Sequence, residues 1–475
     1  MKYIYILVLI LASWSAKAVT NVQYQDDFKQ LLDIMYESHA NLKWLVTERN
    51  INLEQHISKT KNALSQAKGD DESKAIIDKF INYFNDPHMR LKWRNGNVVN
   101  NPTSKSMCEK LGFFERHKVG IKYHNIPEFS AVKDKRVNIF EIGVLSLENK
   151  KVGVLKIDLF DPLGHLEICN ETINTLELSS SETCDEECLL NVEITASNIL
   201  SNKLIDHVHV LEEQGINALM VDIASNGGGS NWSHAVARLL TKIKIKSASL
   251  GFIRHPHWIE QLTLSLSLIE EDLLNVSNTK NTNLQLAKER YSKALKLAKM
   301  KCPVQIKVDR GTTDCELVVQ NIMFSTGALD YVSPGKLNGL KSKEHLFNPS
   351  IYEYQEGEYN GPLLIHVDEW TASSSELFAS TLSDNNAASI IGVPTMGAGC
   401  GYTNDGIKHT LEHSKATVLL PDCVRFRADG SNEVFGVTPD ILLPWRMNKR
   451  FPSNEYQRGK IIVEGLKYWM KQSSF

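Results

Sequence analysis

The sequence has little net charge, and it has no long apolar run beyond its first residues. Lys and Arg number 53 against 56 Asp and Glu, which gives a formal net charge of −3, and there is no polybasic run. Nucleic-acid or membrane-surface binding usually needs a basic patch, so the composition indicates neither kind of partner. No apolar run after residue 18 is long enough to cross a bilayer. The length of 475 residues and the 42% hydrophobic content are typical of a globular chain with a large core.

Two common motifs of nucleotide-binding proteins and ester hydrolases are also missing. A strand-like run at 218–223 leads into Gly227-Gly228-Gly229 and then a helical pattern, but neither Gly-Lys-Ser/Thr nor G-x-G-x-x-G follows. The stretch 370–375 contains three serines and no glycine, so it has no G-x-S-x-G elbow. The glycine run fits an oxyanion hole, in which backbone N–H groups approach an anion closely, and it fits a plain flexible turn as well.

The N-terminus predicts a secretory signal peptide over residues 1–18. Lys2 provides a short positive start, residues 3–14 are apolar, and Ala16-Lys17-Ala18 is a small-x-small cleavage site. We expect a mature chain that begins near Val19, is secreted or periplasmic, and has no membrane association after cleavage. An uncleaved membrane anchor is the alternative.

The sequence contains eight cysteines, and an even number in an exported chain favours disulfides. Their spacing suggests the pairs Cys302–Cys315 and Cys400–Cys423, with one bond among Cys169, Cys184 and Cys188. A zinc site built on Cys184 and Cys188 is the alternative, but no second close pair accompanies them. The eighth cysteine is Cys108.

Hydrophobic periodicity divides the chain into four regions after the signal peptide. Residues 19–94 carry apolar residues at helical spacing and predict a helical N-terminal domain. Residues 95–150 are turn-rich and β-like. In residues 151–445 buried strands alternate with helices, which predicts an α/β core with parallel strands, interrupted by insertions near 165–200 and 255–345. Residues 446–475 predict a C-terminal helix.

The most informative stretch is Thr371-Ala372-Ser373-Ser374-Ser375-Glu376. It follows an apolar run at 362–367 and precedes apolar residues at helical spacing, so the serines lie at a strand-to-helix turn. The first N–H groups of a helix are unpaired and the helix dipole is positive there, which favours an oxyanion beside a nucleophilic serine. The same pattern also fits a simple helix cap in which Ser373 and Glu376 form a capping box.

Two histidines are candidates for a general base. Pro87 ends a helical pattern, so His88 lies on a loop that leads into a strand-like run at 89–93. His165 follows the strand-like run at 152–157 and is a minor candidate. Either histidine could instead be a solvated or structural side chain.

Four segments, in this order, resemble the tail-specific (C-terminal processing) and tricorn-core serine peptidases. Asp86-Pro87-His88 resembles D-x-H, and residues 222–229 resemble D-L-R-x-N-x-G-G with Ala224 in place of arginine. Residues 371–376 resemble S-A-S-A-S-E, and residues 432–440 resemble the closing G-V-x-P-D. The resemblance covers roughly 152–443. It implies a crotonase-like (ClpP/crotonase-type) α/β core with a helical N-terminal domain.

The resemblance also implies site residues. Ser373 corresponds to the nucleophile, with oxyanion N–H groups from Ser374 and from Gly228 or its neighbour Gly229. Tail-specific members use a lysine base in T-x-G-K-G, but this chain has Ala398 at that position, and alanine cannot take a proton. The histidine-using, tricorn-like members are therefore the better template.

In that template His88 is the base, and Glu433 orients it directly or through a hydroxyl. A displaced lysine such as Lys408 would be the base if His88 were not.

The function implied is that of an exported serine endopeptidase that acts on a protein or peptide and needs no metal or organic cofactor. Two alternatives remain. One is a non-catalytic binding module on the same fold, resembling the interphotoreceptor retinoid-binding protein, since the lysine is missing. The other is an esterase that uses the same serine. The sequence makes no prediction about the oligomeric state.

Overall fold

The computed structural model describes residues 19–94, 106–116, 120–179, 184–275, 278–300, 316–443 and 454–472. The predicted signal peptide and the predicted pair Cys302–Cys315 lie outside these residues. Within them, no helix combines the length and the apolar character needed to cross a membrane.

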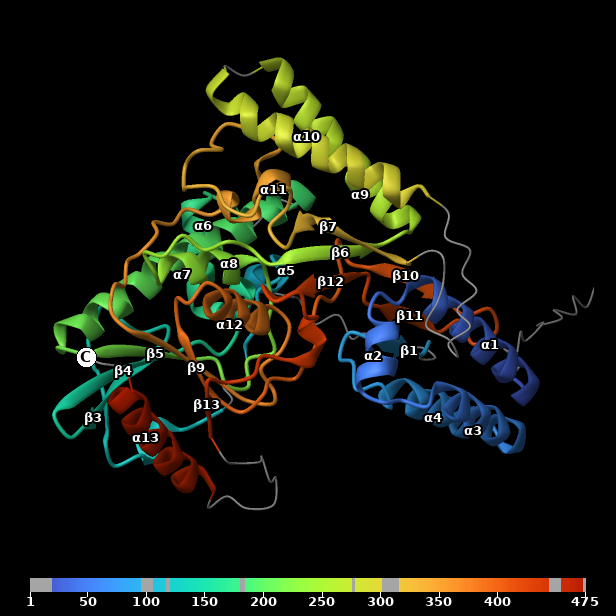
Figure 1. Cartoon of the computed structure of the whole chain (residues 1–475), viewed down its shortest axis with the longest axis horizontal. Coiled ribbons are helices and arrows are strands. Elements are labelled where there is room, and N and C mark those ends of the chain that lie inside the picture. Colours follow the sequence, from blue (N-terminus) through green and yellow to red (C-terminus); the bar gives the residue numbers. More distant parts are fainter. Residues whose placement is uncertain are drawn as a thin grey trace, which may run out of the picture.

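Four helices form the N-terminal part of the structure (Figure 1). They are α1 (Asn21–Ser38), α2 (Leu42–Glu48), α3 (Leu53–Gln66) and α4 (Asp70–Asn82). Their apolar faces share a core that includes Phe28, Phe80 and Phe84, as the helical spacing predicts. The same core contains Val418 and Leu420 of a strand far along the chain, so these helices pack on the C-terminal half of the protein.

That strand belongs to a small antiparallel sheet. β1 (Arg90–Lys92) pairs with β11 (Thr417–Leu420), and β11 pairs with β10 (Ile407–Thr410). β1 directly follows the predicted base, since the chain passes from α4 through His88 into this strand. Pairing with β11 therefore fixes the position of His88 relative to the C-terminal half.

The largest sheet has the strand order β13-β9-β8-β5-β4-β3-β2. From β13 to β4 neighbouring strands are parallel. β3 is antiparallel to β4, and β2 is antiparallel to β3. The predicted α/β class is confirmed. The strands are β13 (Ile441–Leu442), β9 (Ser389–Gly392), β8 (Leu363–Val367), β5 (Ala218–Asp222), β4 (Lys150–Lys156), β3 (Glu141–Leu147) and β2 (Phe129–Ala131).

Helices cover both faces of this sheet. One face packs on α7 (Glu186–Glu213), α8 (Trp232–Leu239) and α12 (Ser374–Asp384), and the other packs on α13 (Asn454–Gln472). Both faces are apolar because parallel strands in the middle of a sheet are buried on each side. The site described below lies at the carboxyl ends of β5 and β8, where chains of this class commonly place ligands.

A second antiparallel sheet has the order β12-β6-β7, with β12 (Cys423–Phe426), β6 (Ser249–Ile253) and β7 (Val318–Phe324). A helical hairpin of α9 (Pro256–Asn275) and α10 (Asn278–Ala298) projects from it at the top of Figure 1. The hairpin lies within residues 255–345, where the sequence predicts an insertion. Short helices complete the fold: α5 (Met107–Lys110), α6 (Cys169–Thr175) and α11 (Lys343–Leu346).

Three disulfides lie within the described residues: Cys108–Cys169, Cys184–Cys188 and Cys400–Cys423. The predicted Cys400–Cys423 pair is confirmed. The expected bond among Cys169, Cys184 and Cys188 is Cys184–Cys188, so the alternative zinc site on these two cysteines is wrong because their sulfurs are joined to each other. The sequence did not predict that Cys169 pairs with Cys108.

Candidate active site

Ser373 lies at the N-terminus of α12 in an uncommon backbone conformation. Its φ is 56° and its ψ is −119°, and its side chain is half-buried. A non-glycine residue with positive φ costs of the order of 1–3 kcal/mol and persists only where its surroundings hold it. Here the Ser373 N–H donates to Glu376 Oε2 at 3.1 Å, and its carbonyl accepts from Arg425 Nη2 at 3.0 Å. The turn is therefore held from both sides.

Glu376 connects the serine turn to the loop formed by residues 395–398. Its buried carboxylate accepts hydrogen bonds from Thr395 Oγ1 at 2.6 Å, from the Gly397 N–H at 2.6 Å and from the Ala398 N–H at 2.8 Å. Burial and the nearby charge of Glu433 raise the pKa of Glu376 to about 7. Glu376 therefore does more than the predicted helix capping, because the same carboxylate also binds residues 395–398.

His88 is bound to this loop by its ring. Its Nδ1 lies 3.1 Å from the carbonyl oxygen of Ala398, and the ring is buried. A carbonyl oxygen can only accept, so Nδ1 carries the proton and Nε2 of the neutral ring has the free lone pair. A general base needs this tautomer. Burial, followed by the positive charge of Arg425, lowers the pKa of His88 to about 4.

The backbone around His88 is fixed by neighbours from both halves of the protein. The His88 N–H donates to Asp86 Oδ1 at 2.9 Å, and Tyr402 donates its hydroxyl to the His88 carbonyl. Asp86 is buried next to His39, whose Nε2 lies 3.5 Å from Asp86 Oδ2, and burial raises the pKa of Asp86 to about 6. These contacts place the ring without using any flexible surface side chain.

Arg49 of the N-terminal helical part attaches the same segment to the core. Its Nη1 donates to the carbonyls of Phe84 and Asn85 at 2.6 and 3.0 Å. Its Nη2 donates to the carbonyls of Gly397 and Val434 at 3.3 and 3.4 Å. One side chain therefore joins the chain before His88 to the two loops that surround the serine turn.

Glu433 is buried, but its partners differ from those predicted. No hydrogen bond joins it to His88 in the part of the chain that the structure describes. It accepts instead from Ser380 Oγ at 2.8 Å and forms an ion pair with Arg425 Nε. The hydroxyl that contacts Glu433 thus comes from α12, and the carboxylate reaches the serine turn through a guanidinium.

Arg425 is the site residue that the sequence analysis missed. Besides Glu433 it binds the carbonyl of Gly399 at 2.7 Å and the carbonyl of Ser373. The sequence does contain a signal for Arg425, because it is the single charged residue in the otherwise apolar segment Cys423-Val424-Arg425-Phe426. A charge in a buried strand is costly unless it is paired, so such a residue points to a specific partner.

The glycine turn after β5 lies directly against the serine turn. Gly228 has φ 101°, and a Cβ on it would lie 2.8 Å from the Ser374 nitrogen. Its N–H is already used, since it donates to Asn226 Oδ1 at 2.9 Å. Within the described residues the N–H groups of Gly229 and Ser374 have no hydrogen-bond acceptor, and the Ser374 hydroxyl donates to the Gly229 carbonyl at 2.9 Å. The two free donors are therefore those of Gly229 and Ser374.

The two other candidate bases lie elsewhere. His165 is buried with its ring edge-on to Phe140, 5.7 Å away between centroids. Lys408 is exposed on β10 and its Nζ lies 3.6 Å from the carboxylate of Asp405. No hydrogen bond or ion pair recorded for the described residues joins either one to Ser373.

Comparison with known proteins finds similarity to peptidases. The model of Peptidase family S41 matches residues 267–443, a stretch that contains Ser373, Arg425 and Glu433. Carboxyl-terminal-processing peptidase 2, chloroplastic, of Arabidopsis thaliana is 35% identical over 96 residues, which are 20% of this chain and 17% of that protein.

Two solved structures share the fold across almost the whole chain. Mature CPAF complexed with lactacystin has a TM-score of 0.56 at 13% identity, covering 95% of this chain and 98% of that chain. A CPAF mutant has a TM-score of 0.58 at 14% identity, covering 95% and 97%. Residues 267–443 thus match peptidase family S41, and the chain shares the fold of these two solved structures.

Proposed function

We propose that this protein is an exported serine endopeptidase in which Ser373 is the nucleophile and His88 is the base. The observation that carries the proposal is that one loop, residues 395–401, binds both groups. Glu376 ties the loop to the backbone of Ser373, and the Ala398 carbonyl holds the ring of His88. A base and a nucleophile on one rigid support is what proton transfer between them requires.

In the proposed reaction Ser373 Oγ attacks a peptide carbonyl while its proton passes to Nε2 of His88. The imidazolium then gives this proton to the leaving amine, and water repeats the cycle on the acyl-enzyme. His88 and Ser373 form no hydrogen bond in this structure, and such bonds often form only when substrate is bound.

Glu433 acts in this proposal through Arg425 and not by direct contact with His88. Arg425 lowers the pKa of His88 by its positive charge. The ion pair with Glu433 offsets that charge, so that Arg425 repels the imidazolium formed during the reaction less strongly. Glu433 is therefore a positioning and electrostatic residue.

The oxyanion donors in this proposal are the N–H groups of Gly229 and Ser374. Neither N–H group has an acceptor among the described residues, and Ser374 adds the positive end of the α12 dipole. Gly228 contributes by its small size, because it lets the glycine turn lie against the serine turn.

Gly228 provides a prediction with a matched control. Gly228→Ala places a Cβ 2.8 to 2.9 Å from the backbone of Ser374 and Ala372 at a positive φ, so one turn must move away from the other. We expect kcat/KM to fall by about 10²-fold or more, the scale of losing one oxyanion donor. Gly227→Ala is the control, since a Cβ there meets nothing within 4 Å. Equal activity of the two variants in a peptide hydrolysis assay would contradict the assignment.

The wider setting is also part of the proposal. We infer a crotonase-like core over residues 151–445 with a helical N-terminal domain at 19–94, and export to an oxidising compartment by the signal peptide at 1–18. The three disulfides are consistent with such a compartment. The substrate is a protein or peptide.

The test is hydrolysis of unfolded casein by the mature protein, combined with labelling by a serine-reactive phosphonate and mass-spectrometric mapping of the label. We expect cleavage of casein and a label on Ser373. Cleavage of short acyl esters alone would favour an esterase. If the protein neither cleaves nor takes the label, the non-catalytic binding module is the better explanation.

The pH dependence of the activity provides a further prediction. His88 acts as base only when it is neutral, and its pKa is lowered to about 4. The acidic limb of kcat/KM should therefore fall near pH 4 and not near 6.5, the ordinary value for histidine. A pH–rate profile with a soluble peptide checks this. A limb near 6.5 would mean that the ring is not buried in the active form.

A further inference from the structure

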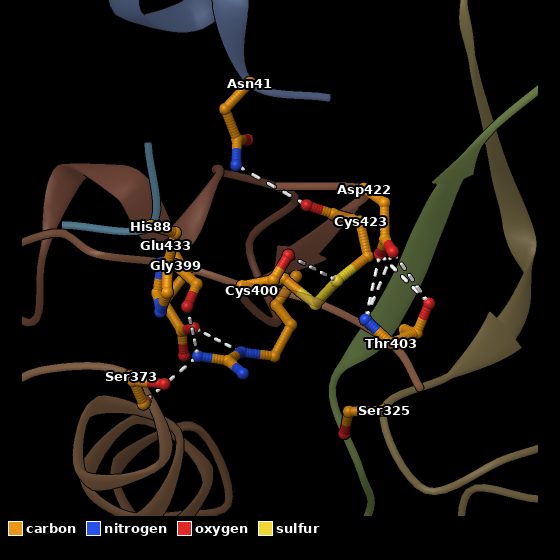
Figure 2. The surroundings of a disulfide bond; sticks show 12 residues. Asn41, His88, Ser325, Ser373, Gly399, Cys400, Thr403, Asp422, Cys423 and Glu433 are labelled. Carbon is orange, nitrogen blue, oxygen red and sulfur yellow. Dashed lines mark hydrogen bonds and ion pairs between the residues drawn. A yellow bond between two sulfur atoms is a disulfide. The ribbon is translucent and has the colours of Figure 1, made fainter. Parts of the chain in front are cut away.

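The Cys400–Cys423 disulfide joins two segments that carry site residues. Cys400 lies between Gly399, whose carbonyl binds Arg425, and Gly401, whose Cα faces the His88 ring. Cys423 belongs to β12, two residues before Arg425. Figure 2 shows the disulfide with Ser373, His88 and Glu433 on one side and Asp422 and Thr403 on the other.

The loop that Cys400 holds is otherwise prone to move. Residues 397–402 form no regular helix or strand and contain Gly397, Gly399 and Gly401. Gly397 and Gly399 have φ values of 73° and 64°. Glycine-rich segments lose more conformational freedom on ordering than other segments do, so strong contacts are needed to hold them.

Contacts at both ends hold this loop. At its start Glu376 accepts from the N–H groups of Gly397 and Ala398. At its end the disulfide connects Cys400 to β12, and the Asp422 N–H donates to the Gly401 carbonyl at 3.1 Å. Between these ends lie the two carbonyls that bind His88 and Arg425.

We propose that the Cys400–Cys423 disulfide is a positioning element of the active site, which clamps the loop that holds His88 and Arg425 and thereby sets the rate of turnover. The proposal rests on the proposed peptidase function. The disulfide proposal adds to that function, because it makes catalysis depend on the oxidation state of one cysteine pair. We therefore expect the protein with this bond reduced to stay folded and to have a lower kcat.

The expected effect follows from the two carbonyls. When the loop loosens, the Ala398 carbonyl no longer fixes the proton on Nδ1, and the Gly399 carbonyl no longer holds Arg425 near the ring. Water also enters, so the burial that keeps the ring neutral is reduced. A misplacement of about 1 Å in such a site can cost about 10²-fold in rate.

Several charged or titratable groups act on the His88 ring from neighbouring segments. Asp86 and Arg90 lie on its own segment, Arg425 on β12, and His39 between α1 and α2. Tyr402 belongs to the loop itself and packs edge-on against the ring, with 5.6 Å between centroids. Among the positive groups, Arg425 is the one that depends on the loop, through Gly399. Its displacement removes a positive charge from the ring and raises the pKa of His88.

The chemical step is a thiol–disulfide exchange. A dithiol reductant attacks one sulfur, the Cys400–Cys423 bond breaks, and each cysteine sulfur ends as a thiol while the reductant becomes a disulfide. Two electrons and two protons pass from the dithiol to the protein.

The experiment compares two double variants that each remove one disulfide. Cys400→Ser/Cys423→Ser removes the proposed clamp, and Cys184→Ser/Cys188→Ser removes a bond with a sequence separation of 4 at the start of α7. We expect the first to lower kcat by about 10- to 100-fold with KM changed less than about threefold. Its acidic limb should move up from near pH 4 toward 6.5, while the control keeps the wild-type profile. Wild-type kcat and pH profile in the first variant would overturn the proposal, even if its Tm fell.

A readout without substrate separates this proposal from the peptidase proposal. In ¹⁵N-histidine NMR, assigned with His88→Gln, the wild-type His88 ring should remain the Nδ1–H tautomer down to about pH 4. In Cys400→Ser/Cys423→Ser it should titrate nearer 6.5. This result would support the clamp even if casein were not cleaved, whereas an unchanged His88 titration would overturn it.

If the double variant does not fold, reduction of the wild type replaces it. The folded protein is treated with dithiothreitol, and aliquots are alkylated to count each free thiol. We expect the decrease in activity, or the change of the His88 signal, to follow the reduction of Cys400 and Cys423 and not that of Cys184 and Cys188. Full reduction of Cys400 and Cys423 without either change would contradict the proposal.

Discussion

Replacing Ser373 by alanine is expected to lower kcat/KM by about 10⁶-fold, which is the scale of losing the nucleophile of a serine hydrolase. The remaining rate would come from the oxyanion donors and from substrate binding alone. The fold should persist, because Ser373 is held by its backbone N–H and carbonyl, and alanine retains both. Peptide hydrolysis and phosphonate labelling measure the effect.

The neighbouring serine provides the control for this experiment. The Ser375 hydroxyl is buried and has no hydrogen-bond partner among the described residues, so Ser375→Ala removes no hydrogen bond of the site. We expect Ser375→Ala to keep activity within a few-fold of the wild type. Similar losses in the two variants would show that the stretch is a structural helix cap and that Ser373 is not the nucleophile.

Replacing Arg425 by glutamine is expected to have the second largest effect, on stability and on activity together. It leaves the Glu433 carboxylate buried without its cation, and breaking a buried pair in this way costs about 3–5 kcal/mol. It also releases the carbonyls of Ser373 and Gly399, which hold the serine turn and the His88 loop. We expect kcat to fall by about 10²-fold or more, since both reacting groups lose a support.

Two further variants separate charge from geometry at Arg425. Arg425→Lys keeps the charge but cannot donate in three directions from a planar group, so it should recover stability better than activity. Arg425→Gln/Glu433→Gln removes both charges and should recover part of the free energy of unfolding, measured by denaturant titration, without recovering kcat. If Arg425→Gln alone kept wild-type kcat, Arg425 would have only a structural role.

The proposed site differs from a simple triad in how its parts are connected. The carboxylate expected to orient His88 is bound to Arg425 and Ser380, and the acceptor for His88 is the backbone carbonyl of Ala398. The backbone of Ala398 supplies both an N–H to Glu376 and a carbonyl to His88.

Local patterns in the sequence were sufficient for the class of the fold and for the place of the serine. The runs at 152–157, 218–223 and 362–367 are apolar except for Lys156, Asp222 and His366, which is typical of buried parallel strands, and they form β4, β5 and β8. The strand, serines and helix at 362–384 are adjacent in the chain, so their turn could be predicted without knowing any distant contact. The disulfide Cys400–Cys423 was predicted because its two cysteines are close in sequence.

The connections among the site residues were decided by tertiary structure alone. His88, Ala398 and Arg425 are hundreds of residues or several elements apart, and tertiary contacts such as the pairing of β1 with β11 and the docking of Arg49 bring their segments together. Sequence periodicity cannot predict which buried carboxylate pairs with which cation, because the pairing depends on all the neighbours that packing brings together. The sequence by itself therefore determined which residues could do the chemistry, whereas the fold decided that Glu433 binds Arg425, that Gly229 and not Gly228 has the free N–H, and that a backbone carbonyl holds His88.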